Sequence, residues 1–162
     1  MRLASWIPFL AMLAPSTAAL PSAGCLGCTL KGYQNGLMVE AMVPAIALST
    51  TVYRMEIAAE GDTLSERFGV SPNGDFWACM DDCRLAGDRI EIAPAFFSPK
   101  QTIAVNVRRS GESVGPDELT VRVFRDEVLA AERMFSPRYD TDEPNGWGCG
   151  EHVFATASLN VP

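Results

Sequence analysis

The sequence of 162 residues lacks any apolar run long enough to cross a lipid bilayer. Its longest run, LASWIPFLAMLA, has about a dozen residues, whereas a spanning helix needs roughly 20. Internal repeats and low-complexity tracts are absent. The formal net charge is −7, without the basic stripe that nucleic-acid binding requires. We therefore expect one domain with no transmembrane segment and no nucleic-acid partner.

The first residues have the layout of a secretory signal peptide. Met1 and Arg2 make a short positive start, the apolar run comes next, and the small-residue tract PSTAALPSAG follows it. Cleavage fits best after Ala18 or Ala19, where small residues occupy the −3 and −1 positions. The sequence therefore predicts export to the periplasm or the extracellular space of a bacterium.

The same tract also resembles a bacterial lipoprotein signal, because SAGC ends in Gly-Cys and would make Cys25 the lipidated N-terminus. It departs from that pattern at Ser22, where a Leu-like residue is usual. Acyl chains on Cys25 would anchor the protein to the outer membrane without a spanning helix. The sequence leaves both interpretations open.

Apolar and polar residues alternate with a period of two along the rest of the chain, which predicts β-strands. In TVYRMEIAAE, for example, Tyr53, Met55 and Ile57 share one face. The turn SPNGD, with Asn-Gly where a hairpin needs positive φ, separates TLSERFGV from its return strand DFWACM. The other predicted strands are GLMVEAMV, DRIEIAPAF, QTIAVNVRRS, LTVRVFRD and HVFATASLNV. The stretch VLAAERMF is the one segment that could be helical.

About seven to nine short strands between Gly, Pro, Asn and Asp turns indicate an all-β fold, namely an antiparallel β-sandwich. A small barrel is the competing fold. The expected organisation is a signal peptide at 1–19, a Cys-containing N-terminal segment at 20–36 and the β-sandwich domain at 37–162. The mature chain is long enough to bury its own core.

The order of three segments resembles the immunoglobulin-like and transthyretin-like β-sandwich domains of bacterial exported proteins, including the regulatory-like domains beside carboxypeptidases. These segments are VYRMEIAAEGDTLSERF, GDRIEIAPAFFSPKQTIAVNV and EPNGWGCGEHVFATASLNV. The resemblance covers most of the mature chain and rests on strand rhythm and terminal cysteines. It implies a sandwich fold and a non-catalytic role, and it transfers no functional residue.

The chain has five cysteines, which an exported protein uses as disulfides. A local bridge between Cys79 and Cys83 is the simplest pairing. Cys149 then pairs with Cys25 or Cys28. Lipidation of Cys25 would leave Cys28 for Cys149 and would pair every other thiol.

A zinc or copper site is the alternative use of the terminal cysteines. Cys25, Cys28, Cys149 and His152 spell C-x-x-C and C-x-x-H, and four such ligands suit a tetrahedral metal. Against this site, the exported compartment favours oxidised thiols. His152 also begins a strand whose apolar face starts at Val153, so we expect it to point to solvent or a loop.

Two further motifs have ordinary structural interpretations. GESVG, with Ser113 at its centre, matches the letters of a hydrolase nucleophile elbow, and Asp140 and His152 follow in the right order. An elbow needs a helix after the serine, whereas a strand is predicted here, so we expect a hairpin loop.

The stretch YDTDEPNGWG gathers oxygen-bearing side chains that could hold calcium, namely those of Asp140, Asp142, Glu143 and Asn145. Their spacing misses the usual calcium loop, and Pro144 interrupts it. A polar turn before the last strand is the favoured interpretation.

These observations predict an exported, disulfide-linked β-sandwich that is not an enzyme and needs no cofactor. Its expected role is structural, adhesive or protein-binding, with another protein or an envelope component as its partner. The alternative is a zinc- or copper-binding protein that uses Cys25, Cys28, Cys149 and His152.

Overall fold

The chain folds into β-strands that follow the period-two alternation of its apolar residues. The computed structural model describes residues 35–44, 51–70, 76–78, 85–97, 101–143 and 150–162. Within these ranges the strands are β1 (Gly36–Met42), β2 (Tyr53–Ala59), β3 (Asp62–Val70), β4 (Phe76–Ala78), β5 (Ile90–Phe97), β6 (Thr102–Arg109), β7 (Leu119–Arg125), β8 (Val128–Phe135), β9 (Asp140–Asp142) and β10 (His152–Asn160). The described residues include no helix that could cross a membrane.

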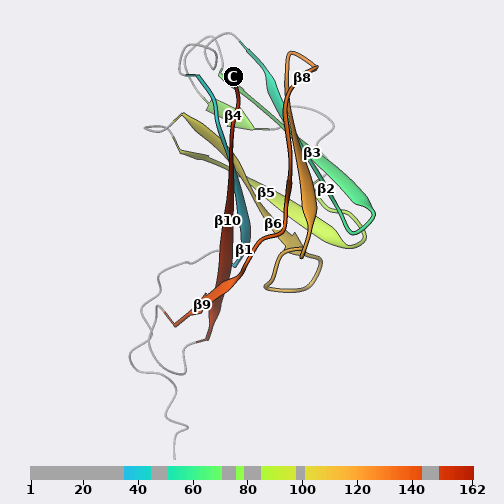
Figure 1. The fold of residues 1–162 in the computed structure, drawn as a ribbon, viewed down its shortest axis with the longest axis vertical. Helices are drawn as coiled ribbons and strands as arrows, with labels where there is room; N and C mark the ends of the chain where they lie inside the picture. The colour runs from blue at the N-terminus through green and yellow to red at the C-terminus, as the bar shows by residue number, and fades with distance from the viewer. Residues whose placement is uncertain (1–34, 45–50, 71–75, 79–84, 98–100, 144–149) are drawn as a thin grey trace, which may run out of the picture.

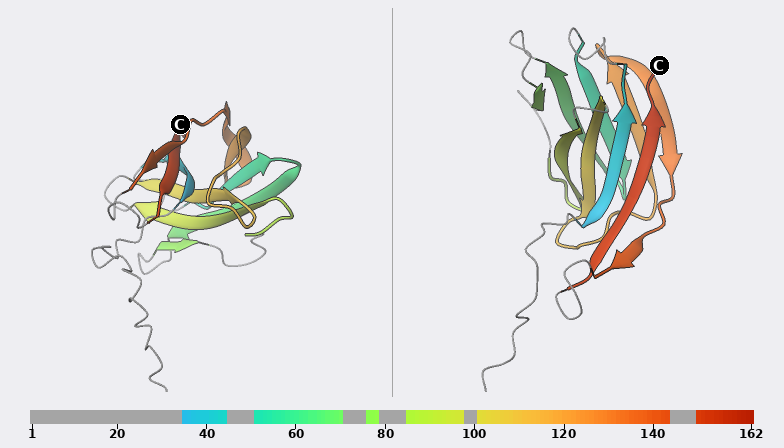
Figure 2. Two further views of the ribbon diagram at one scale, coloured as in Figure 1. Left: turned by 90° about the horizontal axis from the view of Figure 1, so that it is seen from below. Right: turned by 90° about the vertical axis from the view of Figure 1, so that its left-hand side faces the viewer.

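The strands form two five-stranded sheets that lie in two layers (Figures 1 and 2). The first sheet has the order β5-β6-β1-β10-β9, and the second has the order β4-β3-β2-β7-β8. Every pairing is antiparallel except that of β1 with β10. The all-β prediction is confirmed, and the sheets are mostly antiparallel, as expected.

The hydrophobic core lies between the two sheets and is built by alternate residues of each strand. In β2, Tyr53, Met55 and Ile57 are wholly buried, as the sequence predicted. The core also takes side chains from β1, β5, β6, β7 and β10, so both sheets contribute to it. Truncating one large core side chain to alanine typically lowers the free energy of unfolding by about 2–5 kcal/mol. Burial of side chains from both sheets in one core therefore holds the two layers together.

The β1–β10 pair joins strands from opposite ends of the described chain. Leu37 lies opposite Ala155, and Ala41 lies opposite Leu159, in parallel register. The first and last of the described strands thus lie side by side, and β1 is the central strand of its sheet because β6 pairs with its other side.

The segment VLAAERMF is strand β8, and the suggestion that it could be helical is wrong. It forms a hairpin with β7 through a turn at Asp126 and Glu127, both of which have positive φ. A two-residue turn of that kind matches the twist of paired strands. A register shift then leaves Ala130 as the extra residue of a β-bulge opposite Val123 and Phe124.

The connection from β6 to β7 crosses between the sheets, so the GESVG stretch is not the hairpin loop that the sequence predicted. Arg109, the last residue of β6, bonds through Nε to Glu60 at 2.6 Å and through Nη2 to Asp117 at 2.9 Å. The Tyr139 hydroxyl donates to the Pro116 carbonyl at 3.0 Å, and burial raises the pKa of Tyr139 to about 12. These contacts hold the C-terminal end of the crossing loop, at Pro116 and Asp117.

Candidate functional site

The cysteines predicted to form disulfides, to be lipidated or to bind a metal lie outside the described residues. These are Cys25, Cys28, Cys79, Cys83 and Cys149. Their pairing and the metal site therefore stay predictions. No group of three or more potential metal-ligating side chains occurs in the part of the chain that the structure describes.

His152, the fourth residue of the predicted metal set, is the first residue of β10. Its ring is half-buried and stacks on Phe154, with the ring centroids 4.8 Å apart and an interplanar angle of 12°. Opposite it lies Asp142 of β9. The histidine therefore lies within a sheet and packs along its own strand.

The predicted calcium segment is only partly a turn. Asp140 and Asp142 belong to the short strand β9 and are exposed, and the Glu143 amide donates to Asp142 Oδ1 at 2.8 Å. Asn145 lies outside the described residues. Ser113, the centre of GESVG, is exposed, and strand β7 follows it instead of the helix that a nucleophile elbow requires.

The outer face of the second sheet, which points away from the core, carries a continuous ion-pair network. It contains three arginines and three glutamates from four strands and a turn, in the order Arg67, Glu127, Arg54, Glu56, Arg122 and Glu132. The N–O distances run from 2.9 to 3.1 Å. The opposite charges balance, so this face offers neither an anion-binding nor a cation-binding surface.

Arg54 stands at the centre of this network and also contacts an aromatic ring. Its guanidinium carbon lies 3.8 Å from the centroid of the Phe124 ring. The hydrogen bond from Arg54 lowers the pKa of Glu127, which Arg67 also contacts. Because Arg54 and Glu127 each have more than one contact, their side chains have little freedom to rearrange around a ligand.

The edge of this sheet differs from its outer face, because strand β8 pairs with β7 on one side and with no described strand on the other. Three large apolar side chains on β8 are exposed: Val128 by 70%, Leu129 by 49% and Met134 by 70%. Only three other large apolar residues in the described ranges are exposed, and they are less exposed. An eight-residue edge strand with exposed apolar side chains is a template for strand addition.

The edge has two features that limit unselective pairing. Its β-bulge lies at Ala130, and Arg133 points inward, opposite Val121. The Arg133 guanidinium donates to the Ser158 carbonyl of β10 at 3.4 Å and lies 4.9 Å from the centroid of the Phe135 ring. Bulges and inward charges are how natural edges restrict their partners.

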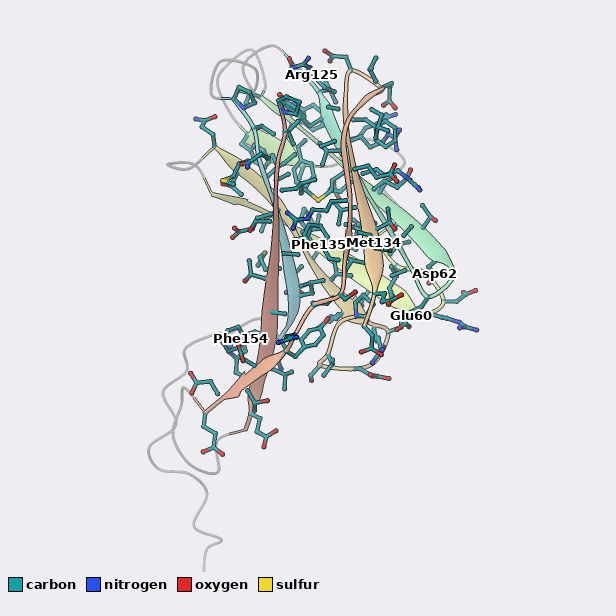
Figure 3. The ribbon with its side chains drawn as sticks, viewed as in Figure 1. Glu60, Asp62, Arg125, Met134, Phe135 and Phe154 are labelled. Atoms are coloured by element: carbon teal, nitrogen blue, oxygen red, sulfur yellow. The ribbon has the colours of Figure 1, made fainter. Side chains whose placement is uncertain are left out.

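An acidic hollow of about 370 Å³ adjoins the β8 edge. Its floor is Ala58 between two threonines, and its walls include Glu60, Asp62, Glu118 and the exposed Met134. Figure 3 shows Glu60 and Asp62 together near the β2–β3 turn, with Met134 on β8 above them. Glu118 makes no ion pair with any described residue. Glu60 is already paired with Arg109, so the negative charge at this end of the apolar edge comes from Asp62 and Glu118.

Comparisons with known proteins give no relative. No family model matches the chain, and no curated protein and no solved structure matches it significantly. The β8 edge is therefore the candidate site on its own geometry. The sequence analysis did not identify this edge. The signal that could have indicated it is a strand with Val128, Leu129 and Met134 but without the proline or lysine that usually protects an edge.

Proposed function

We propose that this protein is an exported, non-catalytic β-sandwich with a structural or adhesive role at the bacterial envelope, and that it binds another protein along strand β8. The observation that carries this proposal is the edge of β8 that no described strand pairs, with Val128, Leu129 and Met134 exposed along it. A strand added there would bury those side chains and pair the free amides and carbonyls.

The expected occupant is an extended segment of a second protein that carries lysine or arginine at one end. Glu118 and its neighbours in the hollow would attract that basic residue beside Met134. The formal net charge of −7 adds to this attraction. A second copy of the same chain would bring equal negative charge and is a poorer fit.

Site-specific photo-crosslinking in the producing cell tests this proposal. A photo-reactive residue at Leu129 should give one defined adduct, while the same residue at exposed Glu112 gives none. The adduct's protein, identified by mass spectrometry and purified, should bind the wild type at least tenfold more tightly than it binds Val128→Lys or Met134→Lys. Leu85→Lys, an exposed apolar residue away from β8, is the matched control. Equal binding by all variants would refute the edge as the site.

Export, cysteine pairing and lipidation form a separate part of the proposal. The intact mass of the exported protein, measured before and after reduction, distinguishes the two hypotheses. Loss of four hydrogens on oxidation would indicate two disulfides, with one thiol left over. A diacyl or triacyl increment at Cys25 would instead indicate a lipoprotein with Cys28 bonded to Cys149. Reduced terminal cysteines with bound metal would favour the alternative site that includes His152.

A further inference from the structure

A second hollow lies on the outer face of the first sheet, away from the β8 edge. Its volume is about 210 Å³, and it is lined by Glu91, Ile92 and Ala93 of β5 and by Asn106 and Arg108 of β6. Ala93 lies opposite Asn106, and Glu91 lies opposite Arg108. The hollow is thus built on two paired strands, which hold its lining in a fixed register.

The floor of this hollow contains a buried amide. Asn106 is only 7% exposed, and its side chain forms no hydrogen bond with any described residue. The amide is not sealed off in the protein interior, because its polar atoms face the hollow. The amide lines the hollow, so its acceptor oxygen and its donor nitrogen are available to a molecule placed there.

Gly36 keeps the space beside this amide open. A Cβ atom at Gly36 would lie 3.2 Å from Asn106 Oδ1, 3.3 Å from Arg108 Cβ and 2.7 Å from the Val107 carbonyl oxygen. Gly36 also has a φ of +112°, a conformation that other residues rarely adopt. The absence of a side chain at this position therefore leaves room around the Asn106 amide.

The walls of the hollow supply both donors and acceptors without a net charge. Arg108 Nε lies 2.6 Å from Glu91 Oε1, and the two side chains are half-exposed and 30% exposed respectively. Because the charges cancel, a charged ligand gains little here. Arg108 retains further N–H donors, and Glu91 retains acceptor capacity, for a neutral ligand.

We propose that this hollow binds one ring of a saccharide. Sugar hydroxyls both donate and accept hydrogen bonds, as do Asn106, Arg108 and Glu91 together, and the methyl group of Ala93 can meet the apolar face of a ring. The volume suits a single ring, whereas an extended peptide needs a longer groove. The proposal is independent of protein binding at β8, because the two surfaces belong to different sheets.

NMR titration of ¹⁵N-labelled full-length protein tests the proposal, with glucose, galactose and N-acetylglucosamine as the sugars and glycerol as a small polyol control. At least one sugar should shift the amide signals of 91–93 and 106–108, with a Kd on the order of 1–10 mM. Glycerol at the same concentration should leave them in place. Equal shifts with glycerol would overturn saccharide recognition, and so would the absence of shifts with all three sugars.

Two variants locate the binding. Asn106→Ala should raise the Kd for the sugar at least tenfold. The variant should keep the fold, because it removes an amide that has no described partner. Asn160→Ala, at an exposed asparagine on the same face, should bind as the wild type does. Unchanged binding by Asn106→Ala, checked for folding by its own NMR spectrum, would exclude this hollow. Loss of photo-crosslinking at β8 would not affect this result.

Discussion

At Glu66 the chain places a carboxyl group inside the hydrophobic core. Strand β3 alternates so that Leu64, Glu66 and Phe68 all face inward, and each is wholly buried. Met55 of β2 lies directly opposite Glu66. Burial raises the pKa of Glu66 to about 7, while a backbone hydrogen bond at Arg67 opposes the rise.

This pKa makes the stability of the fold depend on pH in a defined direction. Between pH 4.5 and 7 the folded protein keeps a proton that the unfolded chain has lost, so the free energy of unfolding falls as pH rises. The shift from 4.5 to about 7 corresponds to a decrease of roughly 3 kcal/mol, complete above pH 7. Glu66→Gln should abolish that decrease and be the more stable protein at pH 8.

Urea unfolding at pH 5, 6, 7 and 8 measures the effect, with Glu132→Gln as the control. That variant also removes one carboxylate, but from an exposed ion pair. If wild type and Glu66→Gln keep a constant difference across the pH series, Glu66 does not titrate in this range and the prediction is wrong.

Only an indirect signal in the sequence pointed to the burial of Glu66. Alternation placed Leu64 and Phe68 inward, and the residue between them had to follow by parity. A carboxylate normally indicates an exposed position, since glutamate is rarely buried fully. Residue type and periodicity conflicted here, and the periodicity of the strand decided the position.

At the scale of elements, strand β8 is where local preference and tertiary pairing disagree. Ala130, Ala131, Glu132 and Met134 all favour helix in isolation. The hairpin with β7 overrides that preference, because pairing satisfies one side of the backbone and places Ala131 and Phe135 against the core. Most other strands combine β-branched residues with alternation, so their positions could be predicted from the sequence, whereas the exposed strand β9 was expected to be a turn.

The turn of the β7–β8 hairpin depends on Asp126. Its backbone N–H donates to the Val52 carbonyl at 3.0 Å, and its Oδ1 accepts from the Val52 N–H at 3.2 Å. Asp126 has a φ of 49°, which aspartate and asparagine tolerate better than alanine does. The turn is thereby fastened to the start of β2.

Asp126→Ala should lower the free energy of unfolding by about 1–2 kcal/mol, because it loses the acceptor and strains the backbone. Asp126→Asn keeps an acceptor oxygen and the same backbone tolerance, and it should stay within about 0.5 kcal/mol of the wild type. Thermal and urea unfolding monitored by circular dichroism measure both variants. Equal losses in the two variants would contradict the role of the side-chain oxygen.

At the scale of the whole molecule, the sequence predicted the kind of fold but not its topology. Strand rhythm reports which residues face inward, whereas the order of strands in a sheet depends on pairings between distant segments. The parallel contact of β1 with β10, the central place of β1 and the short strand β9 all arise from such pairings. The β8 edge and the Asn106 hollow depend on the same order, so they could not be predicted.

Arg109 and Arg133 form hydrogen bonds that join the two sheets at their margins, and the contacts of Arg109 are the stronger. Arg109 on β6 reaches Glu60 in the β2–β3 turn and Asp117 in the crossing loop, and its side chain is 25% exposed. Hydrogen bonds to Glu60 and then to Asp117 raise the pKa of Arg109, so it stays charged. Arg133 makes one longer bond, 3.4 Å, to the Ser158 carbonyl from an exposed position.

Arg109→Gln should therefore lower the free energy of unfolding by about 1–2 kcal/mol, and Arg133→Gln by less than about 0.5 kcal/mol. The larger loss reflects Glu60, a carboxylate that is only 25% exposed and would be left without its cation, whereas the exposed Asp117 contributes little. Urea unfolding with and without about 1 M NaCl measures both losses, and the Arg109 effect should largely persist because partly buried pairs are screened less. Similar losses in both variants, or a loss at Arg109 that disappears in salt, would mean that the core alone holds the two sheets together.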